Sequence, residues 1–197
     1  MLELKDVSKT YPFDHTVIYA LQKLSICIEE GEFTALIGPS GSGKSTVLNI
    51  MGGLDRPTTG SVFFHNKNLA QMGDHELSEF RNQHVGFVFQ EPLLLPHLTV
   101  EENIMLPLTF QGTGHRGQGT VGKKRMGKEE EIHKILRDVG LQNRAQHKPS
   151  ELSGGQKQRA CIARALTQNP SLVLADEPTG NLDSKTGREI LELFKKL

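Results

Sequence analysis

Tryptophan is absent from this 197-residue chain, aromatic residues make up only 6% of it, and there are two cysteines, Cys27 and Cys161. Isolated cysteines without metal-ligand spacing are typical of a reducing compartment. Lysine plus arginine and aspartate plus glutamate both number 23, so there is no net charge to attract nucleic acid. No apolar stretch approaches the roughly 20 residues of a membrane span, and the charged N-terminus lacks the apolar run of a secretory signal. We therefore expect one cytoplasmic domain that reaches a membrane only through partners.

A glycine-rich loop stands between a predicted strand and a predicted helix. The loop consists of Gly38, Pro39, Ser40, Gly41, Ser42, Gly43, Lys44 and Ser45, followed by Thr46. The apolar run 33–37 predicts a strand before it, and 46–51 predicts a helix that stops at the glycine pair 52–53. In this context the backbone N–H groups can point at phosphate, Lys44 can reach the outer phosphates, and the Ser45 hydroxyl can bind Mg²⁺. The alternative is an ordinary glycine-rich turn.

A second helix start also favours an anion. Ser153, Gly154, Gly155 and Gln156 fit a capping box, in which serine caps the helix and glutamine reaches back three residues later. Each glycine in a first turn costs about 1 kcal/mol relative to alanine and leaves the backbone bare for a close approach. We therefore expect another group to pack against this turn, although a merely well-capped helix stays an alternative.

Two acids follow the apolar run 171–175, which suits a buried parallel strand. The carboxyl ends of such strands are where open α/β sheets bind ligands. Asp176 would hold Mg²⁺, and Glu177 would polarise the water that attacks the γ-phosphate. A strand that simply ends in solvent could carry the same pair of acids.

Together these stretches resemble the nucleotide-binding domains of ATP-binding-cassette (ABC) proteins, from about residue 2 to the end. Residues 152–156 are similar to the family signature, and 172–176 to its second nucleotide motif. The resemblance implies an α/β P-loop NTPase fold with a mainly parallel sheet and a small antiparallel β layer. Its single domain, 1–197, would have its core and β layer in about 1–90 and 157–197, and a helical lobe in about 91–156.

The resemblance also implies binding and hydrolysis of Mg-ATP by a head-to-tail homodimer. The signature residues Ser153 and Gly155 would then act in trans, and Asp183 would lie at the dimer contact. Tyr11 stands where the family stacks an aromatic ring on adenine, and Gln90 matches a glutamine that touches Mg²⁺ or the attacking water. The alternatives are a tyrosine that covers a sheet edge and a polar strand end.

Among the branches of the family, the chain looks most like the lipoprotein-release and macrolide-export group. The implied partners are integral membrane permease subunits, which would place the chain on the cytoplasmic face of the cell membrane. The apolar stretch 91–103 would form the cleft for a partner helix, or else belong to the core. The glycine-rich, basic stretch 111–128 is predicted to be a mobile solvated linker, with contact to anionic headgroups as the alternative.

The last residues form a predicted helix with apolar positions 190, 191, 194 and 197. All eight histidines precede Asp176, so none stands where the family places a switch histidine after this helix. We therefore expect a domain that lacks its C-terminal switch region. This leaves open an alternative function, that of an ATP-responsive binding module without hydrolysis.

Overall fold

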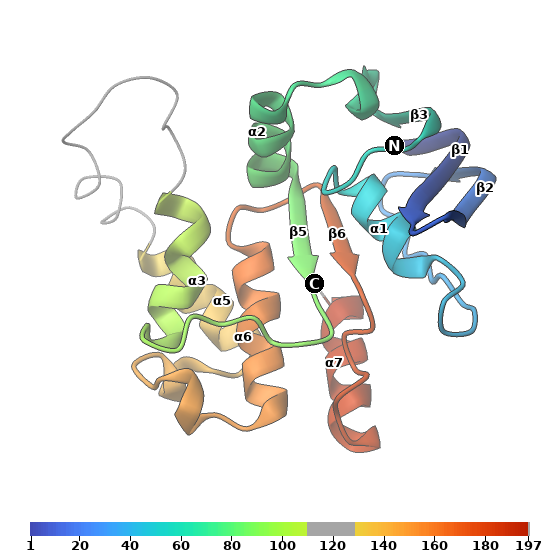
Figure 1. The fold of residues 1–197 in the computed structure, drawn as a ribbon. Helices are drawn as coiled ribbons and strands as arrows, with labels where there is room; N and C mark the ends of the chain where they lie inside the picture. The colour runs from blue at the N-terminus through green and yellow to red at the C-terminus, as the bar shows by residue number, and fades with distance from the viewer. Residues whose placement is uncertain (110–128, 197) are drawn as a thin grey trace. The chain divides into compact units, whose positions relative to one another are not determined.

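The computed structural model describes residues 1–109 and 129–196 (Figure 1). The chain divides into two compact units, Met1–Arg81 and Asn82–Leu197, and each contains its own sheet. The predicted linker at 111–128 lies outside the described residues.

The sheet of the first unit is antiparallel, with strand order β2-β1-β3-β4. Its strands are β1 (Leu2–Phe13), β2 (Thr16–Ile28), β3 (Thr59–Phe64) and β4 (Lys67–Asn68). Leu2, Leu4 and Val62 are almost fully buried, because alternate residues of paired strands face one side of a sheet. The predicted antiparallel layer is confirmed.

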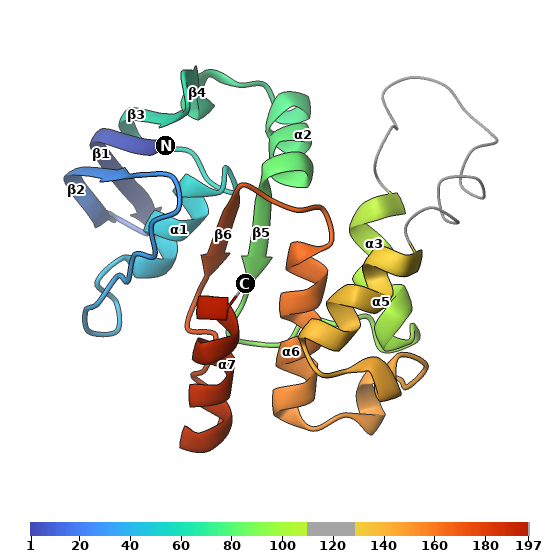
Figure 2. The ribbon, with the colours of Figure 1, turned by 180° about the vertical axis from the view of Figure 1, so that it is seen from behind.

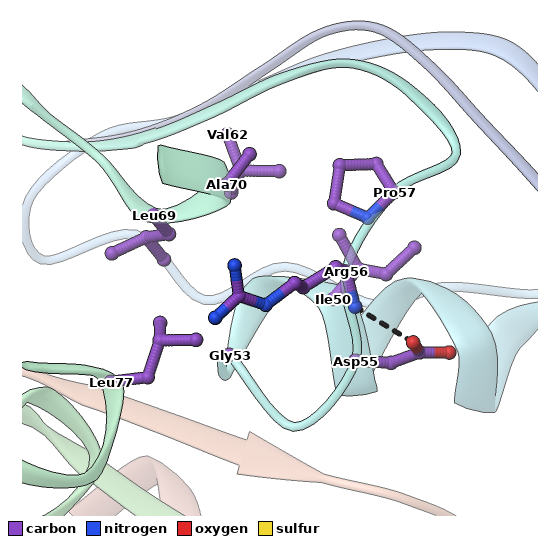
Figure 3. A pocket seen from close by; sticks show the side chains of 9 residues that line it. All are labelled: Ile50, Gly53, Asp55, Arg56, Pro57, Val62, Leu69, Ala70 and Leu77. Atoms are coloured by element: carbon purple, nitrogen blue, oxygen red, sulfur yellow. Dashed lines mark hydrogen bonds between the residues drawn. The ribbon is translucent and has the colours of Figure 1, made fainter. Parts of the chain in front are cut away.

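The helices of the first unit are short. They are α1 (Lys44–Met51), the 3-10 turn η1 (Leu69–Gln71) and most of α2 (Asp74–His84), which continues past the boundary at Arg81. α1 ends where the predicted glycine pair begins, since Gly52 is its C-cap. Figure 3 shows a hollow lined by Ile50, Gly53, Asp55, Arg56, Pro57, Val62, Leu69, Ala70 and Leu77. Arg56 is one of these lining residues, and its guanidinium donates to Asp74 Oδ1 at 2.8 Å.

The predicted strand at 33–37 is wrong, because this run has no strand structure. The side chain of Phe33 is 66% exposed and that of Ile37 is 95% exposed. A strand exists only with a hydrogen-bonded neighbour, and none of the described strands pairs with this run. Apolar composition alone was therefore insufficient to predict the element.

The second unit is built around two parallel strands, β5 (Val85–Val88) and β6 (Leu172–Ala175), with Val88 opposite Ala175. Its helical elements are α3 (Val100–Thr109), α5 (Glu129–Asp138), η2 (Gln142–Arg144), η3 (Pro149–Glu151), α6 (Gly154–Leu166) and α7 (Ser184–Lys196). Figures 1 and 2 show α3 and α5 beside α6. These helices bury one apolar cluster that includes Ile104, Ile132, Leu136 and Ile162. The assignment of 91–156 to a separate lobe stays a prediction.

α7 buries a different stripe from the predicted one. Ile190 and Leu193 are buried with Gly187, Phe194 packs partly against the core, and Leu191 is 42% exposed. Positions 187, 190, 193 and 194 share one helix face, whereas position 191 is turned about 100° away from position 190. The predicted apolar position 197 lies outside the described residues.

Asn103 fixes the turn before α3 through both ends of its side-chain amide. The two hydrogens of its Nδ2 are shared among the carbonyls of Leu95 at 3.1 Å, Leu98 at 3.2 Å and Thr99 at 2.9 Å, and its Oδ1 accepts from Leu95 N at 2.7 Å. Because the side chain is fully buried, water cannot replace these partners. We expect Asn103→Leu to lower the free energy of unfolding by about 2–4 kcal/mol, measured by urea denaturation. The matched variant Asn143→Leu, at an exposed position of η2, should change it by less than about 0.5 kcal/mol, and equal losses would contradict the prediction.

Candidate functional site

The glycine-rich loop leads into α1 as the sequence predicts. Gly43 is the N-cap of α1 with φ 88°, and a Cβ at this position would lie 2.6 Å from the carbonyl oxygen of Ala20. Only glycine fits both this backbone angle and this contact. Lys44 Nζ folds back and donates to the carbonyls of Gly38 and Pro39, both at 2.9 Å. The lysine ammonium and the start of α1 therefore lie on the same short loop.

No acidic group among the described residues pairs with Lys44 of this loop. The first turn of α1 contains no acidic residue. A helix start offers free N–H groups and the positive end of a dipole. The loop, with Ser45 exposed beside it, is thus suited to an external anion such as phosphate.

Tyr11 belongs to a network on the same unit. Its hydroxyl donates to Asp55 Oδ2 at 2.6 Å, and Lys9 Nζ lies 4.8 Å from the centre of its ring while it also binds Asp55 Oδ1. Partial burial, followed by the hydrogen bond to Asp55, raises the pKa of Tyr11. Burial opposes ionisation of Asp55, but hydrogen bonds from Lys9 and Tyr11 hold the pKa of that carboxyl below its usual value. The network fixes the ring, and adenine stacking stays a prediction.

The predicted capping box of α6 is confirmed. Ser153 Oγ accepts from Gln156 N at 3.3 Å, and Gln156 Oε1 accepts from Ser153 N at 2.9 Å. The first turn of α6 carries no acidic residue, so its positive end is not neutralised. A Cβ on Gly155 would overlap the methyl group of Thr186. Thr186 is therefore a group that packs against this glycine-rich turn, as the sequence led us to expect.

Asp183 has a local role that the sequence reasoning missed. Its Oδ1 accepts from the backbone N–H groups of Lys185 at 3.0 Å and Thr186 at 3.1 Å, at the start of α7. The hydrogen bond from the Thr186 side chain and then those from backbone N–H groups lower the pKa of Asp183. An aspartate directly before a predicted helix is the signal of such a cap. Its predicted place at a dimer contact stays a prediction.

The carboxyl ends of β5 and β6 bring three predicted residues to one edge. Asp176 N donates to Val88 O at 2.9 Å, which continues the parallel ladder by one residue. Gln90 and Glu177 follow at this edge. Asn181 Nδ2 donates to Gln90 O at 3.4 Å, and a Cβ on Gly180 would lie 2.8 Å from Gln90 Nε2. The Gln90 side chain therefore packs against the turn that follows Glu177.

Glu177 has a backbone conformation that costs free energy. Its φ is 43°, in the left-handed region, where a residue with a Cβ is disfavoured by about 1–2 kcal/mol. Gly180 N donates to the Glu177 carbonyl at 2.9 Å and closes the turn. Such conformations are concentrated at functional sites. The carboxylate oxygens of Asp176 and the amide oxygen of Gln90 are of the kind that Mg²⁺ binds, so the residues at this edge fit that ion.

Residues 21–180 match the family model for the ABC transporter. The chain belongs to this family. The lipoprotein-releasing system ATP-binding protein LolD of Geobacter metallireducens is 46% identical to the ABC chain over 197 residues, which are 100% of this chain and 83% of that protein. The macrolide export ATP-binding/permease protein MacB of Syntrophobacter fumaroxidans is 44% identical over 100% of this chain but only 26% of its own length.

Solved structures agree with this assignment. A dimeric post-hydrolysis state of the ATP-binding cassette MJ0796, bound to ADP and Pi, is 48% identical and has a TM-score of 0.85. The match covers 100% of the ABC chain and 82% of that chain. The predicted α/β fold with parallel and antiparallel sheets is thereby confirmed. Within 1–109 and 129–196, no helix of the ABC chain is both long enough and apolar enough to cross a membrane.

Proposed function

We propose that this chain binds Mg-ATP and hydrolyses it as one of two ATPase domains that drive a membrane partner. The observation that carries the proposal is the packing of Gln90 against the turn after Glu177, at the carboxyl edge of two parallel strands. This edge offers two carboxylates in adjacent residues after β6, Asp176 and Glu177, and the amide of Gln90 from the segment after β5. The family match makes ATP the substrate that such a set would act on.

In this proposal each residue type supplies one part of the reaction. Glu177 polarises a water molecule, whose oxygen attacks the γ-phosphorus while the bond to the β,γ-bridging oxygen breaks and ADP leaves. Lys44 and the N–H groups of the loop offset the charge that develops on the phosphoryl oxygens. Ser45, Gln90 and Asp176 would hold Mg²⁺, which supplies further charge neutralisation when bound. Tyr11 would stack on the adenine ring.

The second copy of the chain completes the site in this proposal. Ser153 and the adjacent glycines of α6 present a capped helix start without acidic residues, suited to the γ-phosphate held by the partner's loop. A two-fold dimer builds two such sites from the same pair of surfaces. The relative solved with ADP and Pi is a dimer in a post-hydrolysis state. That state favours hydrolysis over a binding module without turnover.

The membrane partner would bind at the segment before α3. Leu93 is 55% exposed and Leu95 is 41% exposed, and Asn103 holds the backbone of this segment in one shape. An ordered segment with exposed leucines is suited to an apolar helix of a permease subunit. With LolD and MacB among the relatives, we propose lipoprotein release or macrolide export as the type of transport, on the cytoplasmic face of the membrane.

ATP binding can be tested through Lys44. We expect Lys44→Ala to raise the dissociation constant of Mg-ATP about tenfold, because one charge-assisted contact to phosphate is lost. The measurement is a titration with a fluorescent ATP analogue. Lys67→Ala removes the same charge from an exposed position of β4 and should leave the constant unchanged. Similar affinities of the two variants would overturn the assignment of the phosphate loop.

A further inference from the structure

Gln158, on the second turn of α6, is a buried polar side chain that the proposed reaction does not use. It is only 1% exposed, and its Nε2 donates to the carbonyl oxygen of Phe89 at 3.0 Å. Its Oε1 has no hydrogen-bond partner among the residues that the structure describes. A buried amide oxygen without a donor is unfavourable, and methionine would fill the same space without that cost. Packing alone therefore does not account for glutamine at this position.

The Gln158 side-chain amide binds the main chain next to Gln90. Phe89 directly precedes Gln90, so its carbonyl belongs to the peptide group that leads into Gln90. On the other side of Gln90, Arg164 Nη1 donates to the carbonyl of Leu93 at 2.5 Å. Both donors come from α6, and together they bind the main chain before and after Gln90. The position of Gln90 thus depends on the position of this helix.

The opposite end of this connection is the capped start of α6. Ser153 is the N-cap, and Gln158 lies in the same helix little more than one turn later. An α-helix is rigid over such a length, so a displacement of Ser153 moves Gln158 by the same amount. Gln90 also packs against Gly180 of the turn after Glu177. The contacts form one chain from the helix start to the residues at the edge of β5 and β6.

We propose that Gln158 is a positioning residue, which couples the start of α6 to the main chain of Gln90. The inference rests on the proposed role of Gln90 in ATP hydrolysis. A phosphate that draws the start of α6 toward it would move the Phe89–Gln90 peptide through the Gln158 amide. Turnover then requires the amide donor at position 158, whereas ATP binding at the phosphate loop does not.

The central variant is Gln158→Met, which keeps the volume of the side chain and removes both the donor and the unpartnered oxygen. We expect kcat for ATP hydrolysis to fall about tenfold or more, with KM changed by less than about twofold. The matched control is Thr167→Val. Thr167 is also buried and hydrogen-bonded after α6, and its hydroxyl is directed to Ile104 O at 2.9 Å and Ala163 O at 3.0 Å rather than to the main chain around Gln90. This control should lower the melting temperature and leave kcat unchanged.

A double variant separates positioning from a structural role. In a Gln90→Ala background, Gln158→Met should have no further effect on kcat, because the residue it positions is gone. An unchanged effect in that background would overturn the proposal. Hydrogen exchange gives a readout that does not depend on turnover: the amides of 89–91 should exchange faster in Gln158→Met, while those of α6 keep their protection. Equal exchange in the parental chain and the variant would also overturn it. If the amides of 89–91 exchange more slowly in the parental chain than in Gln158→Met, as expected, but the parental chain releases no phosphate, only the proposed hydrolysis is contradicted.

Discussion

Glu177→Gln is expected to lower the rate of ATP hydrolysis about a thousandfold while Mg-ATP still binds. Glutamine has almost the same shape as glutamate but cannot polarise the attacking water as a base. Since the signature of one copy would still cover the γ-phosphate of the other, ATP should accumulate in a stable dimer. Single-turnover phosphate release measures the first effect, and light scattering after gel filtration measures the second.

The backbone conformation of Glu177 does not complicate the interpretation of this replacement. Its φ of 43° must be retained by the new residue, and glutamine meets the same steric cost there as glutamate. Glu91→Gln is the matched control, because Glu91 is also exposed and directly follows Gln90. We expect this control to hydrolyse at the parental rate and to remain monomeric after the ATP is consumed. Parental turnover by Glu177→Gln would remove Glu177 from its proposed role.

Ser153→Arg is expected to abolish hydrolysis, with a loss of about a hundredfold or more, and to leave ATP binding by the monomer unchanged. Ser153 is exposed at the N-cap of α6, so a larger side chain can be accommodated in the single chain. In the proposed dimer the same arginine would stand where the γ-phosphate of the partner's ATP belongs. The two measurements are the phosphate release rate and the dissociation constant of Mg-ATP.

Thr99→Arg controls for the lost helix cap. Thr99 Oγ1 accepts from Glu102 N at 3.2 Å and Glu102 Oε2 accepts from Thr99 N at 2.8 Å, so α3 begins with the same capping box as α6. Both variants exchange a capping hydroxyl for arginine and should lose similar stability, about 0.5–2 kcal/mol. Only Ser153→Arg should stop hydrolysis. If Ser153→Arg weakened ATP binding as much as turnover, the argument that the signature acts in trans would fail.

The elements predicted most accurately are those that depend on residues close together in the sequence. The capping box at Ser153 and the end of α1 at Gly52 follow from side chains and backbone angles a few residues apart. The sequence also predicted that some group packs against Gly155, because a glycine in the first turn of a helix leaves the backbone open to a close contact. That this neighbour is Thr186 was not predictable, since it depends on how α7 lies on α6.

Elements that depend on distant partners were predicted poorly. α2 was not predicted, because only Leu77 and Phe80 are buried in its eleven residues, which leaves little apolar periodicity to detect. The bond from Gln158 to Phe89 joins residues 69 positions apart, and a single sequence contains no signal for such a pair. The same limit applies to the buried stripe of α7, where Leu193 rather than Leu191 faces the core.

The unpaired run 33–37 has a consequence for the thermodynamics of nucleotide binding. This run leads directly into Gly38, and with Ile37 at 95% exposure it contributes little buried apolar area to hold the loop in place. Each residue that becomes ordered costs about 1–2 kcal/mol of backbone entropy. Any ordering of the run on binding would be subtracted from the intrinsic affinity of the loop for phosphate. ATP would then stabilise the ordered form of this run, and the melting temperature of the first unit would rise with nucleotide concentration.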